Sequence, residues 1–185
     1  NFAKDVGLIK EVGMFPIIVH GGGPQIGEAL NKKNIKTEFA EGLRITDKET
    51  VKVVEDVLVN QINVDIVNKI NETGGKAIGL AGNKDNLITA KKLLVINKKT
   101  DSNIERLLDI GFVGEPVDVN IDIIKNYLKK DYIPVISPLG CDKINSYNIN
   151  ADTVAGAIAG KIKSDKLLLL TNVSGIMDQN NKLIP

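Results

Sequence analysis

Apolar residues along the chain fall into two patterns. The first consists of short continuous runs bounded by glycine, proline or charged residues, which are typical of buried strands. The second is a three- to four-residue spacing, which is typical of amphipathic helices. The runs predict strands at residues 15–20, 76–81, 132–137 and 165–173. The spacing predicts helices at residues 24–33, 47–72, 121–130 and 151–162.

The remaining segments complete the predicted architecture. Runs 87–96 and 112–119 indicate strands of a smaller and more exposed sheet, and residues 147–150 are expected to be extended. Because strands and helices alternate, we predict an α/β fold, an αβα sandwich around a mainly parallel central sheet. No repeat or linker divides the chain, so we expect one domain over residues 1–185. Both ends resemble cut elements, and we expect this domain to be truncated at each end.

Composition and charge narrow the classes of partner. There are 24 basic and 23 acidic side chains and no basic stripe, which argues against nucleic acid. The apolar runs are far shorter than the roughly 20 residues of a membrane helix, and no signal peptide is visible. The one cysteine, Cys141, excludes an internal disulfide and a four-ligand zinc site, so we predict a reducing compartment and no metal ligands. We therefore expect a cytoplasmic protein; the Asn-, Lys- and Ile-rich composition also allows a plastid.

A glycine loop, Gly21 to Gly23, follows the first predicted strand and precedes a helix that starts at Pro24. Such a loop lets a ligand approach the backbone, and the helix N-terminus attracts an anion. A tight turn without a ligand is the alternative, but three consecutive glycines exceed what a turn needs. The loop therefore predicts phosphoryl binding. His20 could be a general base, although a local hydrogen-bonding role at the strand end is favoured because no nucleophile accompanies it.

Three other segments carry candidate chemistry. Arg44 lies shortly before a helix and could hold a carboxylate through two parallel hydrogen bonds, or it could be an ordinary loop residue. In the extended segment 147–150, Asn148 and Asn150 point the same way, and Asp152 falls in the first turn of the next helix. Asp152 could orient lysines, bind a metal or only favour the helix dipole. The polar turn after residue 170 is a common position for nucleotide contacts.

Taken in order, HGGGPQIGEAL, EGLRITD, YNINADTVAGAIA and LLLLTNVSGIMD resemble the amino acid kinase family, and within it the members that act on N-acetyl-L-glutamate. The resemblance implies ATP-dependent phosphorylation of the γ-carboxylate of N-acetyl-L-glutamate in arginine biosynthesis, with Mg²⁺ accompanying ATP. That carboxylate is already ionised at neutral pH, so the reaction needs alignment and charge neutralisation rather than a general base.

The resemblance also implies roles for individual residues. Gly22 and Gly23 would hold the phosphoryl group, Arg44 would pair with the α-carboxylate, and Asn148 with Asn150 would bind the amino-acid portion. Asp152 would organise the catalytic lysines. The nucleotide would contact seven successive residues, Thr171, Asn172, Val173, Ser174, Gly175, Ile176 and Met177.

Two departures from the family pattern qualify these expectations. The family's Lys-x-Gly-Gly and Gly-Gly-Met-x-x-Lys motifs are absent, so we expect the 185-residue piece alone to be inactive. Asn172 stands where the family often has aspartate, which puts ATP affinity in question.

Family members form dimers or hexamers, and regulation by a PII-type protein is open. The alternatives are another carboxylate or phosphate kinase of the family, or a non-catalytic regulatory module with the same fold.

Overall fold

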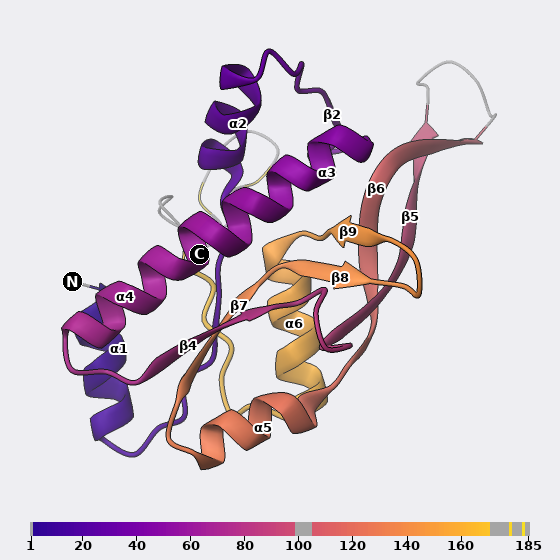
Figure 1. Ribbon diagram of the computed structural model, residues 1–185. Coiled ribbons are helices and arrows are strands. Elements are labelled where there is room, and N and C mark those ends of the chain that lie inside the picture. Colours follow the sequence, from indigo (N-terminus) through magenta and orange to yellow (C-terminus); the bar gives the residue numbers. More distant parts are fainter. Residues whose placement is uncertain (1, 99–104, 171–177, 179–182, 184–185) are drawn as a thin grey trace.

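The computed structural model describes residues 2–98, 105–170, 178 and 183 (Figure 1). The elements in chain order are α1 (Phe2–Glu11), β1 (Ile18–Val19), α2 (Gly23–Lys32), β2 (Phe39–Ala40), β3 (Leu43–Arg44), α3 (Lys48–Glu55), η1 (Asp56–Asn63), α4 (Val64–Glu72), β4 (Ala77–Ala81), β5 (Ile88–Lys98), β6 (Glu105–Val119), α5 (Ile121–Lys129), β7 (Ile133–Ser137), β8 (Leu139–Cys141), β9 (Ser146–Asn148) and α6 (Ala151–Ile162).

The central sheet has the order β1-β7-β4, and all of its pairings are parallel. The long helix α3–η1–α4 lies on one side of this sheet, and α5 and α6 lie on the other (Figure 1). Every residue of β7 is buried, as expected for the middle strand of a sheet covered on both faces. The predicted α/β sandwich with a mainly parallel sheet is therefore confirmed. Because the strands are parallel, their carboxyl ends meet at one edge, where the glycine loop begins.

The predicted helix 47–72 is continuous, although its central part, η1, is π-helical. Its apolar stripe packs Val54, Val57 and Leu58 against α2, and Ile70 packs against α1 and the sheet. Asp47 caps this helix at its N-terminus: its Oδ1 accepts from the N–H groups of Thr50 at 2.7 Å and Glu49 at 3.1 Å. Two side chains of η1, Leu58 and Ile62, lie against the glycine loop.

Replacing Asp47 with alanine is expected to lower the free energy of unfolding by about 1 kcal/mol in urea denaturation at neutral pH, because two N–H groups lose their acceptor. The hydrogen bonds from those N–H groups lower the pKa of Asp47, and the bond from Thr50 has the largest effect. The stabilisation should be complete above an ordinary carboxyl pKa and disappear as the pH falls through the lowered pKa. The control D47N keeps a hydrogen-bond acceptor, so it should lose little stability at neutral pH. Because asparagine does not titrate, this contribution to stability should no longer depend on pH.

Strands β5, β6, β9 and β8 form a closed barrel, and β5 and β6 extend from it as a long hairpin (Figure 1). The prediction of a second sheet beyond the central one is therefore confirmed, but this sheet is not the smaller of the two: it has four strands, whereas the described part of the central sheet has three. Strand β8 and the β2–β3 hairpin were not predicted, since both are too short to show a pattern. Strand β9 pairs with β6 and β8, and it leads directly into α6.

Two strand predictions need correction. Segment 15–20 was expected to be a buried strand, but β1 contains only Ile18 and Val19, both half-buried, and Phe15 is 64% exposed. The reason is that, within the described part of the chain, β1 pairs with β7 alone and therefore has a neighbour on one edge only. The described part of 165–173, residues 165–170, is not a strand, and its leucines are exposed. Four consecutive leucines indicate a need for burial, but they do not specify a backbone partner.

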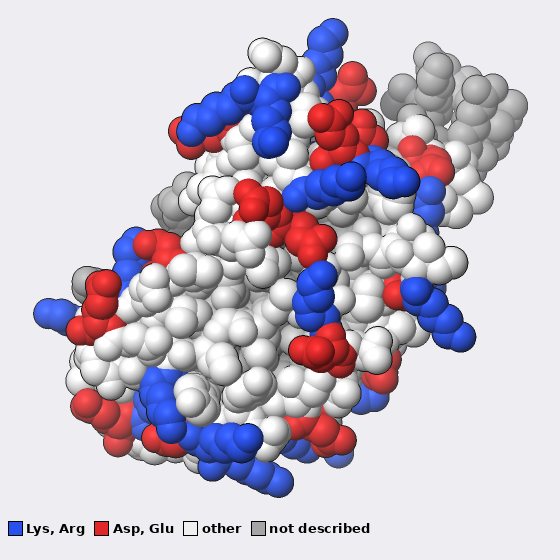
Figure 2. Space-filling view, in the orientation of Figure 1, with Lys and Arg blue, Asp and Glu red and all other residues white. Residues whose placement is uncertain are grey.

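Charges of both signs are interspersed on the face seen in Figure 2, without a large area of one sign. Over the described residues, no helix is both long and apolar enough to cross a membrane.

Candidate functional site

The glycine loop lies at the carboxyl edge of the central sheet, between the N-termini of two helices. Gly23 is the first residue of α2. A Cβ placed on Gly21 would lie 3.9 Å from the Cβ of Ala151, the first residue of α6. The first N–H groups of a helix have no partner within it and carry a partial positive charge. Two helix starts therefore converge on the loop, which suits a negatively charged ligand.

The three glycines differ in their surroundings. A Cβ on Gly22 would lie 2.5 Å from Ile62 Cδ1 and 2.8 Å from Leu58 Cδ2, so the loop packs directly on η1. A Cβ on Gly23 would meet nothing within 4 Å. Gly22 is thus required for packing, whereas Gly23 borders open space through which a ligand can approach the backbone.

Arg44 contacts the glycine loop rather than bulk solvent. It lies in β3, is 9% exposed, and donates from Nη2 to the Gly23 carbonyl at 3.1 Å and from Nη1 to Thr37 Oγ1 at 3.2 Å. Its guanidinium also lies 4.8 Å from the centre of the Phe39 ring, and burial lowers its pKa. These contacts fix the guanidinium beside the loop. Thr37 and Phe39 could not be identified from the sequence, because neither belongs to a recognisable motif.

The predicted alternation in 147–150 is confirmed. Tyr147 and Ile149 are buried in the core, whereas Asn148 is half-buried and Asn150 is exposed. Asn150 caps α6, because its Oδ1 accepts from the Thr153 N–H at 3.0 Å. Asp152 lies in the first turn of α6 and is exposed. The structure therefore brings Asp152 and Asn150 to the same helix start that approaches Gly21.

The turn between β8 and β9, which leads to Asn148, is held by Asp142. Its Oδ2 accepts from the Tyr147 hydroxyl at 2.6 Å, and its Oδ1 accepts from the N–H groups of Ile144 and Asn145, each at 2.6 Å. The Tyr147 hydroxyl, followed by these N–H groups, lowers the pKa of Asp142 to about 2. The same hydrogen bond raises the pKa of Tyr147.

Replacing Tyr147 with phenylalanine is expected to raise the pKa of Asp142 from about 2 toward its ordinary value, because the strongest donor to the carboxylate is lost. In the unaltered protein this carboxylate stabilises the fold above its ordinary pKa, and the contribution disappears as the pH falls through about 2. An NMR titration of the Asp142 carboxyl carbon measures the shift. The control is Y132F, which removes a hydroxyl elsewhere and should leave the pKa of Asp142 unchanged. An equal shift of this pKa in both variants would contradict the role of the Tyr147 hydroxyl.

His20 lies beneath the glycine loop, is 7% exposed, and belongs to a buried polar network. Its Nδ1 lies 3.1 Å from the Gly21 carbonyl oxygen, and its Nε2 lies 3.1 Å from Asn63 Nδ2 and 3.3 Å from Ser137 Oγ. Burial lowers the pKa of His20, which keeps the ring neutral. The local hydrogen-bonding role favoured from the sequence is therefore confirmed. Asn63 was missed, although a polar residue on the apolar stripe of helix 47–72 was a signal that could have found it.

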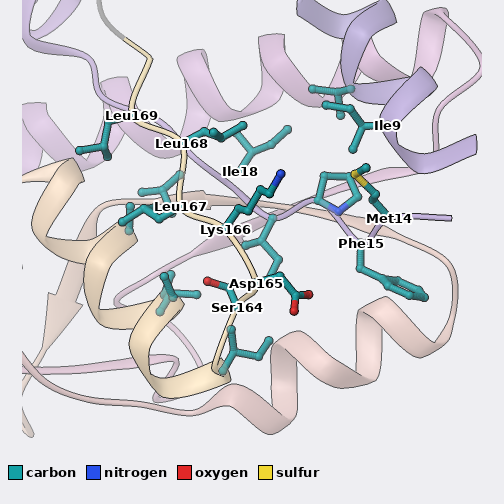
Figure 3. Close-up of a pocket in the computed structure, with 18 of the residues that line it drawn as sticks. Ile9, Met14, Phe15, Ile18, Ser164, Asp165, Lys166, Leu167, Leu168 and Leu169 are labelled. Carbon is teal, nitrogen blue, oxygen red and sulfur yellow. The ribbon is translucent and has the colours of Figure 1, made fainter. Parts of the chain in front are cut away.

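A cavity of about 920 Å³ lies between β1, α1, α6 and residues 163–170 (Figure 3). Its walls are mainly apolar and include Met14, Phe15, Ile18, Leu167 and Leu168. At one end it reaches the glycine loop and the start of α6, where its lining includes three further residues, Gly21, Ala151 and Asp152. The cavity therefore connects segment 163–170 with the loop.

The predicted nucleotide contacts, 171–177, lie outside the described residues. Within the described part of the chain, no three His, Cys, Asp or Glu side chains gather as metal ligands would.

Comparison with known proteins gives a consistent result. The sequence model of the amino acid kinase family matches residues 1–185. Acetylglutamate kinase of Parvibaculum lavamentivorans is 53% identical over 185 residues, and that of Rhodospirillum centenum is 50% identical over 186. Each alignment covers 100% of this chain and 61% of the relative, so the chain spans about three fifths of their length.

Among solved structures, smu.665 from Streptococcus mutans UA159 matches with a TM-score of 0.82 and 27% identity, over 96% of this chain and 68% of that one. An N-acetylglutamate synthase from Neisseria gonorrhoeae, complexed with coenzyme A and N-acetyl-glutamate, matches with a TM-score of 0.78 and 19% identity. That match covers 98% of this chain and 39% of the other and supports the fold alone.

Proposed function

Because the chain belongs to the amino acid kinase family, we propose that the protein containing it transfers the γ-phosphoryl group of ATP to the γ-carboxylate of N-acetyl-L-glutamate. The substrate assignment is supported by relatives of about 50% identity that are acetylglutamate kinases. The product is an acyl phosphate, and the step belongs to arginine biosynthesis. We further propose that ATP arrives with Mg²⁺, that the enzyme is a cytoplasmic homodimer or hexamer, and that a PII-type protein is a possible regulator.

The observation that carries this proposal is the contact between Arg44 and Gly23. The guanidinium that could bind a substrate carboxylate is held 3.1 Å from the loop that could hold a phosphoryl group. Phosphoryl transfer to a carboxylate needs these two anions close together and aligned, while the charge between them is neutralised. A site is suited to this task if it holds the substrate carboxylate beside the backbone N–H groups that receive the phosphoryl group.

The remaining residues take the following proposed roles. Asn148 and Asn150 bind the amino-acid portion of the substrate, since both come from the segment that ends at the start of α6. Gly22 and Gly23 supply backbone N–H groups to the phosphoryl group in transit. Asp152 orients lysines contributed from elsewhere in the protein.

Nucleotide contacts are proposed for 171–177. This placement is supported by the preceding segment, 163–170, which lines the cavity that reaches Asp152. ATP would then approach the glycine loop at Gly21, whereas Arg44 contacts Gly23.

The function is tested by assaying the complete protein for ADP release and trapping the acyl phosphate with hydroxylamine. We expect both signals to depend on N-acetyl-L-glutamate. Glutamate, aspartate and uridine monophosphate serve as controls for the other kinases of the family. Turnover with one of these controls, but not with N-acetyl-L-glutamate, would reject the substrate assignment. ATP binding without turnover of any acceptor would favour the regulatory module.

A further inference from the structure

We infer that His20 is a positioning residue that turns the Gly22 N–H toward the phosphoryl group, an inference that rests on the function proposed above. The ring of His20 is buried directly beneath the glycine loop, yet the transfer to an ionised carboxylate requires no proton from it. A buried imidazole that takes no part in the chemistry has a role through the groups that it contacts.

The contacts of His20 specify which ring nitrogen carries the proton. Asn63 donates from Nδ2 to the Val135 carbonyl at 2.9 Å, which fixes the orientation of its amide. The second Nδ2 hydrogen faces His20 Nε2 at 3.1 Å. Because an amide nitrogen can only donate, Nε2 must accept. In a neutral ring the proton is then on Nδ1, which donates to the Gly21 carbonyl at 3.1 Å.

The hydroxyl of Ser137 is compatible with this assignment. Its Oγ lies 3.3 Å from both His20 Nε2 and the Leu58 carbonyl. With Nε2 unprotonated, the single hydroxyl proton is directed to the Leu58 carbonyl or to Nε2, and either arrangement leaves the Nδ1 proton for Gly21.

This donation determines the direction of the next N–H group. The peptide between Gly21 and Gly22 is trans, so its C=O and N–H point in opposite directions. Since the Gly21 carbonyl is held by the buried ring, the Gly22 N–H points away from the core. Without this hydrogen bond a glycine peptide could rotate readily, because glycine has little steric restriction. His20 therefore removes a rotational freedom from the loop before the phosphoryl group arrives.

The surroundings are shaped to keep the network in place. A Cβ on Gly79 of β4 would collide with Asn63 Oδ1, so only glycine leaves room for this amide. Asn63 is 4% exposed and lies in η1, and Ser137 is fully buried at the end of β7. Two elements, η1 and β7, thus contribute polar side chains that contact His20 and backbone carbonyls.

The tautomer can be measured without any assay of activity. His20 is the only histidine among these 185 residues. In the complete protein labelled with ¹⁵N-histidine, its signals are identified by their absence in H20N. We expect an Nδ1–H tautomer that persists below the ordinary pKa of histidine. An Nε2–H tautomer would overturn the inference, whatever the protein phosphorylates.

Two substitutions test the consequence for catalysis. The side-chain amide of H20N can place a donor where Nδ1 stands, whereas H20Q reaches toward Nε2 and lacks that donor. We expect H20N to retain kcat within about threefold and H20Q to lose at least about tenfold, each with a small change in the KM for N-acetyl-L-glutamate. If His20 only fills the core, the larger glutamine should be the better replacement.

The reverse order, with H20Q active and H20N impaired, would therefore overturn the positioning role, and so would equal activity of the two variants. Thermal unfolding of both proteins identifies a loss caused by misfolding; if H20Q does not fold, the tautomer measurement decides. If the unaltered protein does not phosphorylate N-acetyl-L-glutamate, the proposed function fails, while the tautomer still tests how the loop is held.

Discussion

Replacing Arg44 with alanine is expected to raise the KM for N-acetyl-L-glutamate about 100-fold, with a change of less than about threefold in the KM for ATP. The removed guanidinium would leave the substrate α-carboxylate without its charged partner, and such charge-assisted hydrogen bonds are worth about 3 kcal/mol. The structure fixes this guanidinium beside Gly23 rather than leaving it in solvent. Steady-state kinetics with each substrate varied in turn measures the two effects separately.

Two further variants distinguish the binding of the substrate carboxylate by Arg44 from the contacts that hold Arg44 beside the glycine loop. R44K keeps the positive charge but cannot make two parallel hydrogen bonds, so its KM should lie between those of the unaltered protein and R44A. T37V removes only the contact with Thr37 Oγ1 and should change KM less than about threefold. Equal increases of both KM values in R44A would indicate a general loss of the site. An unchanged KM for N-acetyl-L-glutamate would remove Arg44 from the substrate site.

The fold was predictable to the extent that its elements carry a periodic pattern. Helix α6 was predicted at its observed bounds, and the long helix was found because its apolar spacing continues across the π-helical η1. The strand expected at 165–173 was not predictable in this way. A run of leucines predicts that the segment is buried, but it does not identify the strand with which the segment pairs. The exposed leucines of 167–170 and the residues of β1 instead line a shared cavity.

The site could be predicted where it follows a local rule. A glycine loop between a strand and a helix places N–H groups at the sheet edge, and Asn150 before α6 is a recognisable cap. Contacts between distant segments carry no such signal. Arg44 reaches Gly23 only because the β2–β3 hairpin folds over the loop, and His20 meets Asn63 because a helix 43 residues later packs beneath it. These pairs depend on tertiary packing, which no local pattern in the sequence reveals.

Replacing Gly23 with alanine is expected to lower kcat about 100-fold and leave folding intact. The added methyl group meets nothing within 4 Å in the protein, so the structure can accept it. It would instead occupy space beside the backbone that the phosphoryl group must approach, and a misplacement of about 1 Å can cost two orders of magnitude in rate. Thermal unfolding and the rate of ADP release, measured on the same sample, test both parts of this expectation.

Two neighbouring glycines provide matched controls. G22A directs its methyl group toward Ile62 and Leu58, so it should destabilise the fold by about 1–3 kcal/mol as the loop shifts away from η1. G27A lies one turn further along α2 with nothing within 4 Å; because alanine favours a helix interior more than glycine does, it should be active and more stable by about 0.5–1 kcal/mol.

The three variants together separate packing from catalysis. If G23A is fully stable but slow while G27A remains active, the loss of rate is due to the loop and not to a general disturbance of α2. If G23A retained the full rate, the phosphoryl group could not pass beside Gly23, and the role proposed for the loop would have to be abandoned even if the protein phosphorylates N-acetyl-L-glutamate.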